Sequence, residues 1–306
     1  CRKHDIKLFF YYSQLDWYRD DYFPRGRTGN GITGRGEGKW EDYINFMKAQ
    51  LTELLTNYGA IGGIWFDGQW DQHEWDGKRF GKINVDFKLK EVYDLIHELQ
   101  PQALIGSNHH LTPNPGEDFQ MFEKDLPGKG TKDFATSKDD IGNLPLEVCE
   151  TINGSWGFNL KDRKHKSEKE LIQYLIKAAG YDSNLLLNVG PMPNGEIQEE
   201  HIKSLEKIGR WVKQYGETIY QTRKGPIDPT DQVVSTRKEN KIFIHVLDPS
   251  KEKLVIENFS EKIKKINYFD SGKKVNYSYN RSTLKIDLQK ENIDNIDTIL
   301  EITLIN

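Results

Sequence analysis

The stretch Ile61-Gly62-Gly63-Ile64-Trp65-Phe66-Asp67-Gly68 is a short apolar run that ends abruptly in an aspartate and a glycine. An apolar run of this length is typical of a buried strand in a parallel sheet. Such a strand delivers its last side chain to the carboxyl edge of the sheet, where barrel enzymes keep their catalytic groups. Asp67 is therefore the first candidate for a functional residue.

The composition of the 306 residues indicates a folded chain but points to no macromolecular partner. Hydrophobic residues make up 36% and charged residues 29%, and no apolar run approaches the roughly 18 residues that cross a bilayer. A formal charge of −4, from 43 basic and 47 acidic side chains, provides neither a basic surface nor a polybasic stretch. We therefore expect no nucleic-acid partner and no membrane partner.

Metal and cofactor chemistry finds little support in the sequence. The two cysteines, Cys1 and Cys149, are too few for a cysteine-based metal site or a disulfide framework. His109 and His110 are neighbours, so their side chains would leave a strand in opposite directions, and no third ligand has fitting spacing. We expect no metal and no cofactor, and a hydrogen-bonding role for these histidines.

Strands and helices alternate through the first two thirds of the chain, which implies a parallel sheet covered by helices. The strand bodies are apolar and their carboxyl ends carry polar and aromatic residues, which favours a barrel over the alternative, an open doubly wound sheet. The predicted strands are Ile6–Tyr12, Ala60–Asp67, Ala103–Ser107, Leu146–Ile152 and Asn184–Val189, and the predicted helices are Trp40–Tyr58, Phe87–Leu99, Ser167–Gly180 and Gln198–Gly216.

Five strands are too few to close a (β/α)₈ barrel. We therefore expect an α/β chain with a (β/α)₈-type, TIM-like barrel that is partial here, with the C-terminal five strands present and three units missing from the start. Cys1-Arg2-Lys3-His4-Asp5 is typical of a helix end that runs into a strand, which agrees with a missing start. The missing start also leaves the localisation unknown, although a secreted or periplasmic location is slightly favoured over a cytoplasmic one. The oligomeric state is open.

The character of the sequence changes after Lys224-Gly225-Pro226. Helical periodicity stops, and short alternating segments punctuated by turn residues take over. This pattern predicts a C-terminal antiparallel β-sandwich of about 80 residues. The predicted domains are residues 1–224, the barrel part, and residues 225–306, the sandwich. The predicted sandwich strands are Lys241–Val246, Lys253–Glu257, Lys264–Phe269, Thr283–Leu288 and Thr298–Leu304.

Carboxylate side chains are the best candidates for catalytic groups in this sequence. Hydrolysis of a glycosidic bond needs one carboxylate at the anomeric carbon and a second, protonated one at the leaving oxygen, and the two must come from different strand ends. Asp67 supplies the first. Candidates for the second lie in the long loop after the Ala103–Ser107 strand and in the next strand: Glu117, Asp118, Glu123, Glu147 and Glu150.

Four motifs occur in a fixed order along the chain. They are Tyr11-Tyr12-Ser13 followed by Asp16-Trp17, Ile64-Trp65-Phe66-Asp67-Gly68, Thr151-Ile152-Asn153-Gly154-Ser155-Trp156-Gly157, and Leu185-Leu186-Leu187-Asn188-Val189-Gly190-Pro191 followed by Gly195-Glu196-Ile197. Together they resemble the retaining α-L-fucosidases of glycoside hydrolase family 29. The resemblance covers about residues 5 to 222 closely, whereas the C-terminal part matches the family only in general architecture.

The resemblance implies a retaining exo-α-L-fucosidase that acts on a fucosylated oligosaccharide or glycoconjugate. It assigns Asp67 as the nucleophile and Glu123 as the acid/base, because Phe122–Gly128 resembles the family loop with a glutamate before a Pro-Gly turn. Glu147 is the reserve, since it aligns with the glutamate of the family's Trp-Glu-Thr-Cys-like stretch, where this chain has Leu146-Glu147-Val148-Cys149. Tyr12 and Trp65 would line the sugar pocket, His109 would contact a fucose hydroxyl, and Trp156 would pack on the fucose methyl.

Two family segments are absent from this chain, a His-Trp-Gly-like one and a Lys-His-His-Asp-Gly-Phe-like one, whose histidines bind the fucose. Their absence agrees with the missing strands. The incomplete barrel also keeps open a non-catalytic sugar-binding protein on a degenerate glycosidase scaffold. A further alternative is a retaining hydrolase of a related sugar such as galactose. The retaining mechanism predicts that the two catalytic carboxyl groups lie roughly 5–5.5 Å apart.

Overall fold

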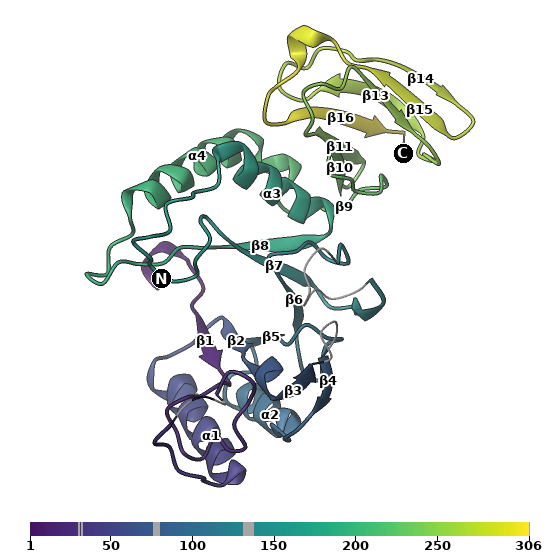
Figure 1. Cartoon of the computed structure of the whole chain (residues 1–306). Helices are drawn as coiled ribbons and strands as arrows, with labels where there is room; N and C mark the ends of the chain where they lie inside the picture. The colour runs from purple at the N-terminus through teal and green to yellow at the C-terminus, as the bar shows by residue number, and fades with distance from the viewer. Residues whose placement is uncertain (30, 32, 76–79, 131–137, 306) are drawn as a thin grey trace. The chain divides into compact units, whose positions relative to one another are not determined.

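The computed structural model describes residues 1–29, 31, 33–75, 80–130 and 138–305. The chain divides into two compact units, Cys1–Val148 and Cys149–Asn306. Figure 1 labels the helices and strands of both units. Over the described ranges, no helix is both long enough and apolar enough to pass through a bilayer.

A parallel sheet organises the first unit. Its strand order is β1-β2-β5-β6, with β7 next to β6, and the pairings of β1 with β2, β2 with β5 and β5 with β6 are parallel. The strands are β1 (Phe9–Ser13), β2 (Gly63–Asp67), β5 (Leu104–Asn108), β6 (Phe119–Glu123) and β7 (Leu146–Thr151), of which β7 runs on into the second unit.

Two helices cover one face of this sheet, α1 (Trp40–Asn57) and α2 (Leu89–Leu99) (Figure 1). Their apolar residues recur at helical spacing and meet the strand residues that alternate toward them. The sheet contributes Ile64 and Phe66 of β2 and Ile105 of β5, all fully buried. The helices contribute Tyr43, Ile44, Met47, Leu51 and Leu55 from α1 and Val92, Tyr93 and Ile96 from α2.

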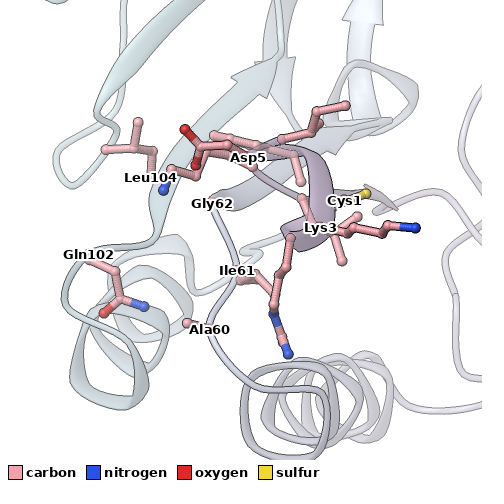
Figure 2. Close-up of a pocket in the computed structure, with 13 residues that line it drawn as sticks. Cys1, Lys3, Asp5, Ala60, Ile61, Gly62, Gln102 and Leu104 are labelled. Atoms are coloured by element: carbon pink, nitrogen blue, oxygen red, sulfur yellow. The ribbon is translucent and has the colours of Figure 1, made fainter.

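The opposite face of the sheet carries glycines where neighbouring groups come close. A Cβ on Gly63 would lie 2.1 Å from the Leu104 carbonyl oxygen and 2.5 Å from the Phe9 ring. A hollow of about 950 Å³ opens at the amino ends of β1, β2 and β5, and Figure 2 shows Ile61, Gly62 and Leu104 around it. Because Asp67 ends β2, this hollow lies at the other end of the strands from the candidate nucleophile.

Shorter elements complete the first unit. A hairpin of two short antiparallel strands follows a 3₁₀ turn that begins two residues after Asp67. The elements are η1 (Arg2–His4), η2 (Gln69–Gln72), β3 (His73–Trp75), β4 (Phe80–Ile83) and η3 (Lys138–Asp140).

The second unit contains the end of β7, the helix α3, the strand β8, which neighbours β7 in the sheet, and the helix α4. The helix α3 starts with a capping box, in which the Ser167 side chain accepts from the Glu170 backbone N–H and the Glu170 side chain accepts in return from the Ser167 N–H. A second helix and a short 3₁₀ turn lead on to the C-terminal strands. The elements are α3 (Glu168–Gly180), β8 (Ser183–Asn188), α4 (Glu199–Tyr215) and η4 (Gly216–Thr218).

All strand pairings after residue 222 that the structure describes are antiparallel. They form a five-stranded sheet, β13-β16-β11-β10-β9, and a three-stranded sheet, β12-β15-β14. The strands are β9 (Arg223–Lys224), β10 (Val233–Lys238), β11 (Lys241–Val246), β12 (Lys253–Ile256), β13 (Ile263–Tyr268), β14 (Asn276–Asn280), β15 (Thr283–Asp287) and β16 (Thr298–Leu304), with η5 (Lys290–Asn292) before the last one.

The two antiparallel sheets share one core, to which Ile244 of β11 and Ile286 of β15 contribute, so they form a sandwich. The outer face of the larger sheet packs on the helices through a separate cluster that contains Ile176 of α3, Trp211 of α4 and Phe243 of β11. The helices therefore belong to the same compact unit as the sandwich. The domain boundary near residue 224 stays a prediction.

The predicted parallel sheet with covering helices and the predicted C-terminal antiparallel sandwich are both present. The prediction missed β6, because Phe119–Glu123 follows β5 after a loop, residues 109–118, with no helix between the two strands. The parallel sheet therefore contains six strands rather than five. Glu123 is the last residue of β6, not a loop residue.

Substitution of Ile64 tests how strongly the sheet depends on this core. Ile64 is fully buried, so Ile64→Ala removes apolar contacts and leaves a cavity. We expect a loss of about 2–5 kcal/mol in the free energy of unfolding, measured by urea denaturation. The control is Ile305→Ala, because Ile305 is 56% exposed, and it should change the value by less than about 0.5 kcal/mol. Equal losses for both variants would contradict the assignment of the core.

Candidate active site

The register of three neighbouring strands brings their carboxyl ends to one level. Ser13 of β1 pairs with Asp67 of β2, and Asp67 pairs with Asn108 of β5. Side chains at the same level on adjacent parallel strands point to the same face. Asp67 therefore has Asn108 beside it on the face opposite the helices.

Three donors hold the Asp67 carboxylate. The Tyr11 hydroxyl donates to Oδ2 at 2.7 Å, and the Trp70 indole N–H donates to Oδ1 at 2.9 Å. The Asn108 side-chain amide donates to the same Oδ1 at 3.3 Å. The donors come from β1, from the turn η2 after β2 and from β5, so the fold fixes the carboxylate from three sides.

Asn108 also joins Asp67 to a second carboxylate. The Asn108 Nδ2 lies 2.9 Å from Glu123 Oε2 and 3.3 Å from Asp67 Oδ1. These two oxygens can be no farther apart than the sum of the two distances, 6.2 Å. Separations of roughly 5–5.5 Å suit a retaining glycosidase, and roughly 6.5–9.5 Å suits an inverting one. The bound applies to one oxygen of each carboxylate, and it places the two groups close enough to act on one sugar.

Tyr11 and Trp65 form an aromatic wall beside Asp67. Their rings stack with centroids 5.6 Å apart at 26°. Much of the Tyr11 side chain is exposed, but its hydroxyl lies against Asp67. Loss of water around the hydroxyl, followed by the charge of Asp67, raises the Tyr11 pKa well above its ordinary value. The hydroxyl therefore keeps its proton and remains a donor to Asp67.

Glu147 lies on the same side of the sheet, where burial removes water from around its carboxyl group. The Trp65 indole N–H donates to Glu147 Oε1 at 2.9 Å. Burial raises the pKa of Glu147, and the Trp65 hydrogen bond opposes part of this effect. A carboxyl group with a raised pKa is a reasonable proton donor near neutral pH. Trp65 thus lies between Tyr11, which holds the nucleophile candidate, and the reserve acid.

His109 is buried, and internal partners occupy both of its ring nitrogens. Its Nδ1 accepts from the Leu111 backbone N–H at 3.1 Å, so Nε2 is the nitrogen that donates to Glu117, at 3.0 Å. Glu117 also accepts from the Tyr93 hydroxyl and the Asn114 amide. The structure therefore places His109 in a buried hydrogen-bond cluster, and the expected contact with a fucose hydroxyl stays a prediction.

His110 is the histidine that approaches the carboxylate pair. Its backbone has a left-handed φ of 63°, and its Nε2 lies 3.8 Å from Glu123 Oε2. Burial, followed by the charge of His109, lowers the pKa of His110 to about 3. At neutral pH the imidazole is uncharged, so its approach to Glu123 is a polar contact rather than an ion pair.

Tyr12 does not join this group. It lies in the core on the helix side of the sheet, where its ring meets Phe66 edge-on and its hydroxyl donates to Gln50 of α1 at 2.7 Å. Strand alternation explains the placement, because Tyr11 pairs with Trp65 and Tyr12 with Phe66. Of the two adjacent tyrosines, Tyr11 is the one beside Asp67.

Trp156 belongs to the second unit, in the segment between β7 and α3. It is 37% exposed, and its carbonyl oxygen accepts from the Asn188 amide at 2.8 Å. Asn188 ends β8, so the contact joins two of the motifs that carry the family resemblance. The expected packing of Trp156 on a fucose methyl stays a prediction.

The three donors to Asp67, which are Tyr11, Trp70 and Asn108, have no role predicted from the sequence. A signal exists for Asn108, which ends an apolar run just as Asp67 does. Trp70 follows Asp67 by only three residues, which puts it near by chain connectivity. No sequence signal separates Tyr11 from Tyr12, because the choice depends on strand register. Within the described residues, no group of three or more His, Cys, Asp or Glu side chains could hold a metal ion.

Comparison with known families gives one match that covers most of the chain. The family model described as alpha-L-fucosidase matches residues 1–217. Alpha-L-fucosidase 1 of Arabidopsis thaliana is 28% identical over 186 residues, which are 56% of this chain and 35% of that protein. Human tissue alpha-L-fucosidase is 23% identical over 231 residues, which are 72% of this chain and 43% of that protein. The chain thus spans less than half the length of these relatives.

Solved structures share the fold over nearly the whole chain. Alpha-L-fucosidase isoenzyme 1 from Paenibacillus thiaminolyticus superposes with a TM-score of 0.79 at 27% identity, covering 100% of this chain and 73% of that one. An alpha-L-fucosidase from Bacteroides thetaiotaomicron has a TM-score of 0.76 at 21% identity, covering 100% and 69%. The predicted barrel-type architecture with a C-terminal sheet domain is confirmed by this likeness. The chain belongs to the α-L-fucosidase family, glycoside hydrolase family 29.

Proposed function

We propose that the protein is a retaining exo-α-L-fucosidase that removes terminal α-L-fucose from oligosaccharides or glycoconjugates. Membership of the family supports the sugar and the reaction. The observation that carries the mechanism is the amide of Asn108, which lies within hydrogen-bond distance of both Asp67 and Glu123. Two carboxylates that share one amide donor lie close together, which supports attack by a carboxylate rather than by a water molecule.

In the first step, an oxygen of Asp67 bonds to the anomeric carbon while the glycosidic C–O bond breaks. Glu123 gives its proton to the leaving oxygen, so the remaining sugar departs as a neutral alcohol. In the second step, the Glu123 carboxylate takes a proton from water, the water oxygen bonds to the anomeric carbon, and the ester to Asp67 breaks. Two inversions retain the configuration.

Side chains around Asp67 assist this sequence. Tyr11, Trp70 and Asn108 fix the carboxylate before substrate arrives, which reduces the cost of reaching the transition state. The Bacteroides relative was solved as a trapped covalent intermediate, which is the species that the proposal assigns to Asp67. Aromatic surface from Trp65 and Tyr11 suits a sugar that carries a methyl group.

Asp67→Ala removes the attacking oxygen. We expect the full-length variant to lose about 10⁴-fold or more in kcat on an aryl α-L-fucoside, while its circular dichroism stays that of the parent. The control is Asp94→Ala, which removes an exposed carboxylate on α2 and should leave activity unchanged. If Asp67→Ala keeps its activity within tenfold of the parent, the assignment of Asp67 as the nucleophile is refuted. A parent that binds fucose without releasing phenol would favour the sugar-binding alternative, and preference for an aryl galactoside would favour the galactosidase alternative.

Tyr11→Phe and Tyr12→Phe form a matched pair, because each removes one hydroxyl from adjacent positions. Tyr11→Phe takes a donor from Asp67, so we expect kcat to fall about 10- to 100-fold with little change in KM. Tyr12→Phe takes a donor from Gln50 in the core, so we expect normal kcat and a loss of about 1 kcal/mol in stability. The reverse result would support the prediction that Tyr12 lines the sugar pocket.

Glu123→Ala and Glu147→Ala separate the acid/base from its reserve. Removal of the acid should cost about 10²–10⁴-fold with a leaving group that needs a proton, and much less with a dinitrophenyl leaving group. We expect Glu123→Ala to show this dependence, together with rescue by azide. Glu147→Ala should affect both substrates alike. If only Glu147→Ala shows the dependence, Glu147 is the acid/base and Glu123 is a supporting residue.

A further inference from the structure

The loop that follows β1 lies against the candidate nucleophile. The backbone N–H of Gln14 donates to the Asp67 carbonyl oxygen at 2.6 Å. A Cβ on Gly68 would lie 2.8 Å from the Leu15 Cβ, so the chain at Leu15 presses on the residue that follows Asp67. Gly68 has φ 96°, a left-handed conformation that glycine adopts without strain. The loop after β1 is therefore at the carboxyl end of the sheet, where the candidate site lies.

A buried aspartate fixes the far part of this loop. Asp71, in the turn η2, is 1% exposed and accepts from the Thr28 backbone N–H at 2.8 Å and from the Thr28 hydroxyl at 2.7 Å. It also accepts from the Tyr22 hydroxyl at 3.1 Å. Gly26 leaves room for it, because a Cβ there would meet the Asp71 carboxylate at 1.7 Å. The neighbouring Trp70 is the residue that donates to Asp67.

Trp17 is held by this framework and yet faces solvent. Its indole N–H donates to the Thr28 hydroxyl oxygen at 3.0 Å, while that hydroxyl donates onward to Asp71. Asp16 accepts from the backbone N–H groups of Tyr18 and Arg19, which fixes the turn that carries Trp17. The Trp17 side chain is nevertheless 53% exposed. The structure therefore keeps a large apolar ring in one orientation without burying it.

Within the described part of the chain, the Trp17 indole makes neither a stacked-ring contact nor a cation–π contact, and the residue is 53% exposed. Its neighbour differs, because the Arg35 guanidinium lies 4.3 Å over the Tyr18 ring. An exposed tryptophan whose polar N–H is already satisfied offers only apolar surface to a ligand. The C–H face of a pyranose ring is a surface of matching chemistry.

We propose that Trp17 is the platform for the leaving-group sugar, the pyranose that carries the terminal fucose. The inference rests on the proposed fucosidase activity and extends it to the choice of substrate. The path of contacts from Asp67 through Trp70, Asp71 and Thr28 sets the ring at a fixed position relative to the nucleophile. Stacking there orients the glycosidic bond and favours substrates in which a pyranose follows the fucose.

The experiment compares the Trp17→Ala variant with the parent, both as the full-length protein, on two substrates. The first is α-L-fucosyl fluoride, whose leaving group has no surface to stack. The second is a trisaccharide that ends in α-L-fucose linked to a pyranose. We expect Trp17→Ala to keep its kcat/KM on the fluoride within about twofold. On the trisaccharide we expect kcat/KM to fall about tenfold or more, mainly through KM.

Two further variants sharpen the comparison. Tyr58→Ala removes an aromatic ring of similar exposure, 52%, at the C-terminal end of α1, and it should leave both substrates unaffected. Thr28→Val removes the hydroxyl that holds the indole, and it should lower trisaccharide hydrolysis less than Trp17→Ala does. Equal effects of Trp17→Ala on the two substrates would overturn the platform. A parent that hydrolyses neither substrate would instead overturn the proposed activity.

Discussion

The in-register parallel pairing of β1, β2 and β5 is the constraint on which the rest of the site depends. It puts Ser13, Asp67 and Asn108 at one level, and it puts Tyr11 beside Trp65 two residues earlier along the same strands. A slip by one residue would turn every one of these side chains to the helix side of the sheet. The buried residues Ile64, Phe66 and Ile105 oppose such a slip, because it would expose them and bury Asp67. The hydrophobic core thus fixes the position of the carboxylates.

Polar groups at the carboxyl ends are arranged so that each supports another. Asn108 contacts Asp67 and Glu123, Trp65 contacts Tyr11 and Glu147, and Glu117 gathers His109, Tyr93 and Asn114. Networks of this kind hold their members in place because a broken contact leaves a buried polar group unsatisfied. Asp67 and Glu147, the reserve acid, differ in surroundings, since Asp67 has three donors around it whereas burial raises the pKa of Glu147. A raised pKa suits a proton donor, which is why Glu147 stays the reserve beside Glu123.

The turn after β2 links chemistry to substrate choice. Trp70 and Asp71 are adjacent, yet one donates to the candidate nucleophile and the other anchors the loop that carries Trp17. A single short element, η2, thereby positions both the attacking group and the proposed platform for the leaving group. Asp71 attaches the loop through hydrogen bonds from Thr28 and Tyr22, and the buried Tyr22 ring also packs on Trp40 and Tyr43.

The sequence by itself determined the alternation of strands and helices, the change to antiparallel strands near residue 224, the family, and Asp67 as a strand-end carboxylate. These features follow from local patterns, namely apolar runs, helical spacing and turn residues. Only the tertiary structure decided that Glu123 ends a strand of the sheet, that Tyr11 rather than Tyr12 contacts Asp67, and that Asn108 joins the two carboxylates. Each of these depends on which residues of separate strands stand level with one another, and register is a property of paired strands that no single segment encodes.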